Sequence, residues 1–127
     1  MVDPGRKRIL LVEDDFDIGE ALGELLREMG HSVVLATNGR LGLDALQRVG
    51  SRFDVILLDL MMPVMDGYEF RARQLADPKF SMVPCVIVSA DTKAKNRLAE
   101  LRPAALLGKP VPIEELTALI DAFGTAA

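Results

Sequence analysis

Acidic residues stand directly after two of the most apolar segments of this sequence. Residues 9–12 read Ile-Leu-Leu-Val and lead into three consecutive acids, and residues 55–58 read Val-Ile-Leu-Leu and lead into Asp59. Two carboxylates about 4 Å apart repel each other by roughly 4 kcal/mol at an effective dielectric constant near 20, so a gathered set needs a cation. Oxygen ligands of this kind suit Mg²⁺.

A hydroxyl and an amine follow two further apolar segments. Ser89 comes after residues 86–88, and Lys109 lies just beyond the weaker segment 104–107. A metal ion and an ammonium group neutralise phosphoryl oxygens while a carboxylate attacks phosphorus. These residue types therefore favour a site for a phosphoryl group, in which one of the carboxylates is the nucleophile.

Short apolar segments alternate with helical patterns along the chain, and helical spacing is clear at Ile18, Leu22, Leu25 and Met29. With residues 32–36 as the second segment, five β and five α units alternate. This alternation predicts a parallel sheet with helices on both faces, and right-handed connections make it a doubly wound sandwich. We expect the strand order 2-1-3-4-5, in which the first and third strands flank the ligand-binding edge. That order brings the acidic segments together.

Several residues are suited to the ends of helices. Asp15 can cap the first helix, Asn38 the second and Asp66 the third, because their side chains accept hydrogen bonds from free backbone N–H groups. Gly30 is placed to end the first helix. Gly67 is expected to allow a tight turn into the third helix.

Length and charge bound the class of protein. The chain has 127 residues, half of them apolar, and a net charge of −4, which predicts one globular domain without an electrostatic footprint for nucleic acid. The basic residues 6–8 are interpreted as a solvated lead-in to the first strand. The single cysteine, Cys85, excludes an internal disulfide. No signal peptide or bilayer-spanning segment is recognisable, so we expect no membrane association and a cytoplasmic location.

Four motifs in chain order resemble the receiver domain of bacterial response regulators, the CheY-like family: VEDD, DLMMPVMDG, VSA and GKP. The resemblance covers roughly residues 7–124 and leaves residues 1–6 and 125–127 as loose termini. It implies a flavodoxin-like (βα)5 fold. It also implies that Asp59 accepts a phosphoryl group from a histidine kinase or a histidine phosphotransfer protein.

The resemblance also implies the residues of the site. Asp14 and Asp15 would hold Mg²⁺, joined by Asp59 and the backbone carbonyl of Met61. Glu13 is interpreted as flanking this set rather than as a ligand.

Ser89 would hydrogen-bond a phosphoryl oxygen and Lys109 would pair with it. The peptide bond between Lys109 and Pro110 would be cis, which is common only before proline.

The sequence departs from the family pattern at Leu106, where receivers usually carry Tyr or Phe. In the family that ring turns inward when the hydroxyl residue moves toward the phosphoryl group, and leucine cannot report in this way. The stretch from Ser89 to Lys109 is also short, so we expect the fourth helix, which carries the apolar stripe Ala94, Leu98 and Leu101, to be shortened or repositioned.

Each candidate also has a simpler interpretation. Asp59 alone could end a strand, and Asp15 could be only a helix cap. Ser89 could be a small strand-end residue and Lys109 a solvated lysine. His31 is interpreted as an ordinary exposed histidine.

Other functions compete with the receiver. The first is a phosphatase of the haloacid dehalogenase type, but this needs a second aspartate where Met61 stands. Another is flavin binding, but the acids after the first strand would repel the phosphate of a flavin unless a metal intervened. A pseudo-receiver that binds partners without phosphorylation stays open because of Leu106. We favour a phospho-acceptor switch that is not an enzyme and whose output is contact with a downstream protein.

Overall fold

A computed structural model of the protein describes residues 5–48 and 52–123. Its parallel sheet has the order β2-β1-β3-β4-β5, which confirms the predicted order and the α/β class. The strands are β1 (Arg8–Val12), β2 (Ser32–Ala36), β3 (Val55–Leu58), β4 (Cys85–Ser89) and β5 (Ala105–Gly108). The helices are α1 (Phe16–Glu28), α2 (Gly39–Gln47), α3 (Gly67–Ala76), α4 (Leu98–Leu101) and α5 (Ile113–Ala122). The loose termini expected at residues 1–6 and 125–127 lie largely outside the described residues.

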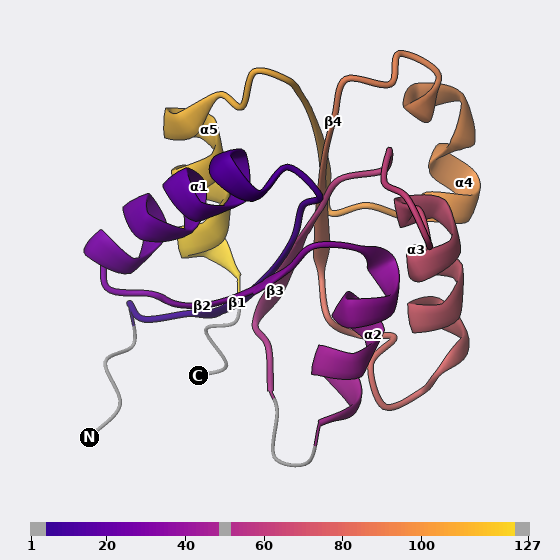
Figure 1. Ribbon diagram of the computed structural model, residues 1–127, viewed down its shortest axis with the longest axis horizontal. Helices are drawn as coiled ribbons and strands as arrows, with labels where there is room; N and C mark the ends of the chain where they lie inside the picture. The colour runs from indigo at the N-terminus through magenta and orange to yellow at the C-terminus, as the bar shows by residue number, and fades with distance from the viewer. Residues whose placement is uncertain (1–4, 49–51, 124–127) are drawn as a thin grey trace.

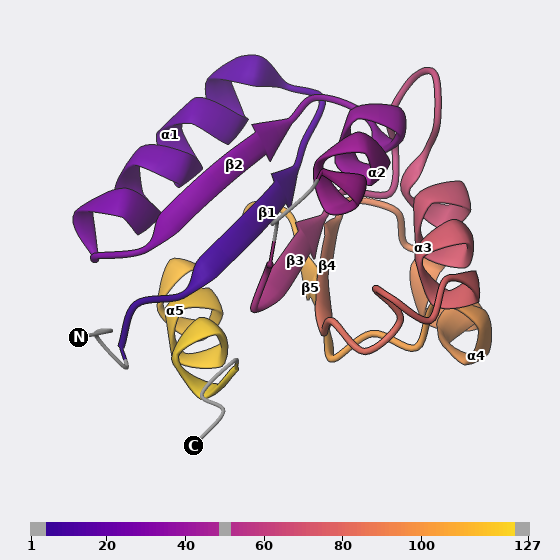
Figure 2. The same ribbon diagram turned by 90° about the horizontal axis from the view of Figure 1, so that it is seen from below.

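Helices cover both faces of the sheet. Figures 1 and 2 show α1 and α5 on one face and α2, α3 and α4 on the other. Alternate residues of β1 enter the two cores: Leu10 and Val12 join the cluster under α2 and α3, whereas Ile9 and Leu11 join the cluster under α1 and α5. Because both faces are covered, every residue of β3 is buried, which explains its continuous apolar sequence.

Strand register determines which residues leave the sheet together. Val12 of β1 pairs with Leu58 of β3, and Ser89 of β4 pairs with Gly108 of β5. The residues that follow these pairs must therefore emerge at one edge of the sheet, as the strand order predicted.

The predicted helix caps are confirmed. The side chains of Asp15, Asn38 and Asp66 accept hydrogen bonds from the backbone N–H groups three residues later, at the starts of α1, α2 and α3. Gly30 follows α1 with a φ of +98°, a left-handed conformation that favours glycine.

The segment between β4 and β5 is less regular than a full helix. A 3-10 turn (Ala94–Arg97) leads into α4, which has only 4 residues, and Arg102 then adopts a φ of +45°. This outcome agrees with the expectation of a shortened fourth helix. Ala94 and Leu101 are buried, as their spacing predicted, but Leu98, the third residue of that stripe, is 42% exposed.

Two predictions about the beginning of the sheet are wrong. Lys7 is 1% exposed, so residues 6–8 are not uniformly solvated, and His31 is 4% exposed. Lys7 stands just before β1 and is buried, while Arg6 and Arg8 on either side of it stay exposed. The Nδ1 atom of His31 accepts a hydrogen bond of 3.0 Å from the backbone N–H of Lys7, which accounts for its burial.

Among the helices within residues 5–48 and 52–123, none combines the length and the apolar character needed to span a membrane.

Candidate functional site

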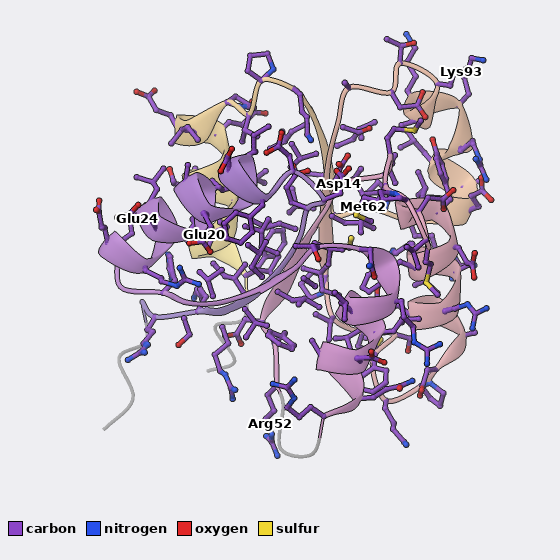
Figure 3. All side chains as sticks on the ribbon, in the orientation of Figure 1. Asp14, Glu20, Glu24, Arg52, Met62 and Lys93 are labelled. Atoms are coloured by element: carbon purple, nitrogen blue, oxygen red, sulfur yellow. The ribbon has the colours of Figure 1, made fainter. Side chains whose placement is uncertain are left out.

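Three carboxylates meet where β1 and β3 end. Glu13, Asp14 and Asp59 each offer an oxygen, and these oxygens lie within 4.8 Å of one another. Glu13 and Asp59 are only 5% and 6% exposed, whereas Asp14 faces solvent. Figure 3 labels Asp14 at this edge of the sheet. The group therefore combines a buried floor with an open side through which a ligand can enter.

Lys109 reaches the same group from the loop after β5. Its Nζ atom lies 2.8 Å from Oε1 of Glu13 and 3.4 Å from Oδ2 of Asp59. The peptide bond between Lys109 and Pro110 is cis, as the resemblance implied. One ammonium group thus faces two buried carboxylates, which leaves the site with an excess of negative charge.

The electrostatics of the site are visible in the pKa values of its members. Burial and the negative charge of Glu13 raise the pKa of Asp59 to about 6, against the opposing effects of Lys109 and of the backbone N–H of Met61. Burial acts to lower the pKa of Lys109, but its hydrogen bond to Glu13 and the charge of Asp59 raise it overall. A further cation would offset the repulsion from Glu13 and so lower the pKa of Asp59.

The acids that the structure brings together differ from the expected set of Asp14, Asp15 and Asp59. Oδ1 of Asp15 accepts a hydrogen bond of 3.1 Å from the backbone N–H of Ile18 as the cap of α1, and Asp15 is not in the gathered group. Glu13 takes its place, and its Oε2 accepts a hydrogen bond of 3.2 Å from the backbone N–H of Asp15. The sequence alone does not reveal where the strand direction ends and the helix turn begins.

The loop after Asp59 packs tightly against the acceptor. The backbone N–H of Met61 donates to Oδ1 of Asp59 at 3.3 Å, and the backbone N–H of Gly67 donates to the carbonyl of Leu60 at 2.9 Å. A Cβ atom on Gly67 would lie 2.4 Å from the carbonyl oxygen of Asp59. Gly67 is therefore required for a close approach of α3 to the acceptor, rather than for the tight turn that was predicted.

Ser89 and Leu106 lie on neighbouring strands beside the site. Ser89 ends β4, is 5% exposed, and its Oγ accepts a hydrogen bond of 3.0 Å from the backbone N–H of Asp91. Leu106 of β5 is partly buried. A hollow of about 400 Å³ is lined by Ser89, Leu106 and Lys109 among others. The leucine therefore occupies the region in which a larger ring would have space.

Sequence reasoning missed a second group of side chains next to Ser89. The hydroxyl of Tyr68, on α3, donates a hydrogen bond of 2.7 Å to Oδ2 of Asp91. The guanidinium of Arg97 lies 3.7 Å from the centre of the Tyr68 ring. No periodic pattern could have indicated these contacts, because they depend on how the short segment before β5 folds back onto α3.

The fold and the position of the acids define a class of protein. A five-stranded parallel sheet in this order, with its ligand edge where the order reverses, is the flavodoxin-like architecture. The family model described as the response regulator receiver domain matches residues 9–121. The chain belongs to this family, whose members act in two-component signalling.

Individual relatives support the same assignment. The response regulator MprA of Mycolicibacterium vanbaalenii is 38% identical over 118 residues, which cover 91% of this chain and 49% of the relative. The chain thus spans about half the length of the curated relatives it matches.

Solved structures of receivers are similar as well. The receiver domain of a sensor histidine kinase from Pseudomonas aeruginosa, with a magnesium ion coordinated in its active site cleft, is 29% identical, with a TM-score of 0.78 over 90% of this chain and 93% of that one. The response regulator TrrA of Thermotoga maritima, in complex with Mg²⁺ and BeF, is 26% identical, with a TM-score of 0.78 over 90% and 96% of the two chains.

Proposed function

We propose that Asp59 accepts a phosphoryl group from a phosphohistidine on a histidine kinase or a histidine phosphotransfer protein, and that this switches contacts with a downstream protein. The observation that carries the proposal is the position of Asp59, which is buried at the edge of the sheet beside two further carboxylates and within 3.4 Å of the ammonium group of Lys109. A buried carboxylate among like charges is an activated oxygen nucleophile once a cation offsets the repulsion.

The donor set fits Mg²⁺. Glu13, Asp14 and Asp59 provide hard carboxylate oxygens close enough to share one ion, and the backbone carbonyl of Met61 on the adjoining loop is a further candidate ligand. The two solved relatives with magnesium at this fold support the choice of metal. When bound, Mg²⁺ would neutralise phosphoryl oxygens as negative charge moves onto them.

The residues of the chain then have separate tasks. A carboxylate oxygen of Asp59 attacks phosphorus while the bond between phosphorus and the histidine nitrogen breaks, and the electron pair returns to the imidazole. Lys109 pairs with an oxygen of the transferred group, and the hydroxyl of Ser89 donates a hydrogen bond to another. Water later hydrolyses the acyl phosphate and restores the carboxylate.

An apolar hollow beside the acids favours a protein as the phosphoryl donor. The hollow has a volume of about 330 Å³ between α1 and the start of α5, and Ile18, Leu25, Val111 and Ile113 contribute to its lining. Val111 also lines a small hollow with Glu13 and Asp59, so the apolar surface is continuous with the site. We propose that the protein that carries the phosphohistidine docks here.

A phosphorylation-independent binding module is the second candidate. It is favoured by Leu106, which replaces the aromatic residue through which receivers report on their hydroxyl residue. Mg²⁺-dependent phosphorylation separates the two candidates, because a pure binding module would not require it. The expectation of a cytoplasmic location stays a prediction. The expectation of no nucleic-acid partner also stays a prediction, since several relatives are named as transcriptional regulators.

The test compares two aspartates of the same chain. The protein is incubated with acetyl phosphate and Mg²⁺, and phosphoryl incorporation is measured by electrophoresis on a phosphate-binding gel. We expect one phosphoryl group per chain, none with EDTA, and none for Asp59→Asn. The control is Asp66→Asn, which keeps the cap of α3 because asparagine also caps helices. Undiminished incorporation into Asp59→Asn would contradict the proposal.

A further inference from the structure

A continuous series of contacts leads from Ser89 to the region around α4. Ser89 Oγ accepts the backbone N–H of Asp91 at 3.0 Å, and Oδ2 of Asp91 accepts the hydroxyl of Tyr68 at 2.7 Å. The ring of Tyr68 lies under the guanidinium of Arg97 at 3.7 Å. Ser89 ends β4, Tyr68 lies in the first turn of α3, and Arg97 immediately precedes α4. These contacts thus join the end of β4, the start of α3 and the segment before α4, next to the phosphoryl site.

The central member of this series is an ionised carboxylate. The hydrogen bonds from Tyr68 and from the backbone N–H of Lys93 hold the pKa of Asp91 below its ordinary value. Asp91 Oδ1 accepts that backbone hydrogen bond at 2.9 Å, so both oxygens are occupied. Hydrogen bonds to an ionised acceptor are stronger than neutral ones, so Asp91 ties the Tyr68 ring to the turn after Ser89 while Ser89 keeps its contact with that turn.

Leu106 is the alternative residue through which Ser89 could transmit a signal, but no side-chain hydrogen bond can join the two. Leu106 can respond to Ser89 only through packing in the hollow they share, since its side chain neither donates nor accepts a hydrogen bond. Tyr68, by contrast, is half-buried against the core cluster under α2 and α3 while its hydroxyl reaches the turn after Ser89.

We propose that Tyr68 is a positioning residue of the switch, acting through Asp91 on Ser89, and that it passes the phosphorylation signal to α4 through Arg97. This inference rests on the proposed function of Asp59. When the Ser89 hydroxyl turns toward the phosphoryl group, the backbone N–H of Asp91 loses its acceptor and the turn rearranges. The Asp91 carboxylate then leaves the Tyr68 hydroxyl, and the ring and Arg97 become free to move together with α4.

The chain offers a direct reporter for this step. Tyr68 is its only tyrosine and it has no tryptophan, so near-ultraviolet emission comes from this ring alone. A carboxylate acceptor quenches the emission of a phenol. We therefore expect emission to rise when Mg²⁺ and beryllofluoride, the ligand pair seen with TrrA, are added to the full chain. Burial and the Asp91 hydrogen bond raise the pKa of Tyr68, so its phenol should also titrate at lower pH after release.

Two variants isolate the contact. In Asp91→Asn the neutral amide no longer quenches, so emission should start high and should not respond to beryllofluoride. The matched control is Glu69→Gln, which changes the neighbouring, exposed residue of α3 and should keep the full response. A response in Asp91→Asn equal to that of the parent chain would overturn the inference.

Reciprocity gives a second readout that a merely structural role would not move. If beryllofluoride breaks the Tyr68–Asp91 contact, then removing the contact must favour beryllofluoride binding. Tyr68→Phe keeps the ring under Arg97 but lacks the hydroxyl, and we expect it to bind beryllofluoride about fivefold more tightly, measured by ¹⁹F NMR. Unchanged affinity would also overturn the inference.

Incorporation at Asp59 is measured on the same samples. If Asp59 is phosphorylated but the emission of Tyr68 stays constant, the inference fails while the proposed function stands. If Asp59 takes up no phosphoryl group and no beryllofluoride, both fail.

Discussion

The acidic edge of the sheet and the region between α3 and α4 differ in how their buried charged groups are paired. At the edge, two buried carboxylates share one ammonium group, and burial together with the negative charge of Glu13 raises the pKa of Asp59 to about 6. Between α3 and α4, the buried guanidinium of Arg71 donates instead to neutral acceptors, the carbonyls of Leu101 and Arg102, each at 2.7 Å. The first region is poised to accept a charged ligand, whereas the second holds a short helix by a few well-satisfied bonds.

This difference separates the residues that carry out chemistry from those that fix the shape of the responding surface. Arg71 also donates to Oε1 of Gln74, whose amide donates to the carbonyls of Phe80 and Val83. Burial lowers the pKa of Arg71, because its partners are carbonyl groups rather than a carboxylate. One end of α4 is thus fixed by Arg71 and the other contacts α3 through Arg97 and Tyr68.

The largest expected effect concerns the fixed end. Arg71→Leu leaves buried carbonyl groups without donors, and we expect it to lower the free energy of unfolding by about 3 kcal/mol. Urea denaturation measures the loss. Arg73→Leu, on the exposed side of the same helix, should cost far less, and equal losses would mean that the Arg71 contacts do not hold α4.

The next effect distinguishes neighbouring acids at the edge. Asp14→Asn should weaken Mg²⁺ binding by roughly tenfold to a hundredfold, because it removes a candidate ligand. Asp15→Asn should bind the ion as the parent chain does, since asparagine preserves the cap of α1. Isothermal titration with Mg²⁺ measures both. A larger loss of affinity in Asp15→Asn than in Asp14→Asn would contradict this expectation. It would support Asp15 as a ligand, as the sequence predicted, in place of Glu13.

A smaller effect tests the cost of holding a negative charge on buried Asp59 beside Glu13. The pKa of Asp59 is raised from 3.8 to about 6, so the stability it contributes is present below the unfolded pKa and is lost as the pH rises through the folded one. Without metal, Asp59→Asn should therefore be more stable than the parent chain by about 1–2 kcal/mol near pH 8, and this gap should close toward pH 4. Urea denaturation of both proteins across this range provides the measurement. A gap that does not change with pH would show that the carboxylate is not strained.

The smallest effect is expected from an exposed pair on α3. Arg73 contacts Glu69 at 2.9 Å, with side chains 58% and 49% exposed. Glu69→Gln should change the free energy of unfolding by less than about 0.5 kcal/mol, because solvent screens the pair. A larger loss in thermal or urea denaturation would mean that surface charges, and not only Arg71, set the stability of this region.

The acidic edge could be predicted from the sequence to a large extent, because it depends on where strands end. Apolar segments placed Asp59, Ser89 and Lys109 at or just after the ends of β3, β4 and β5, and strand order placed those ends at one edge. The sequence-based choice of Asp15 over Glu13 differs from the acids that the structure gathers, since the choice depends on the direction of the backbone over two residues. Local propensity does not encode that direction.

The α3–α4 region was predictable only in outline. A short connection indicated a reduced fourth helix, but the contacts of Arg71 and Tyr68 join residues about 23 to 31 positions apart without any periodic pattern. Such contacts arise from tertiary packing, and a sequence alone does not state which polar side chain will find which carbonyl.

The close approach at Gly67 packs the backbone of Asp59 directly against α3. The carbonyl of Asp59 lies against the first residue of that helix, and no side chain fits between them. Displacements that begin at the acceptor are therefore not absorbed there. They must appear instead in the irregular connection from β4 to α4. The part of the molecule that moves therefore lies on the other side of the site from the contact between Asp59 and Gly67.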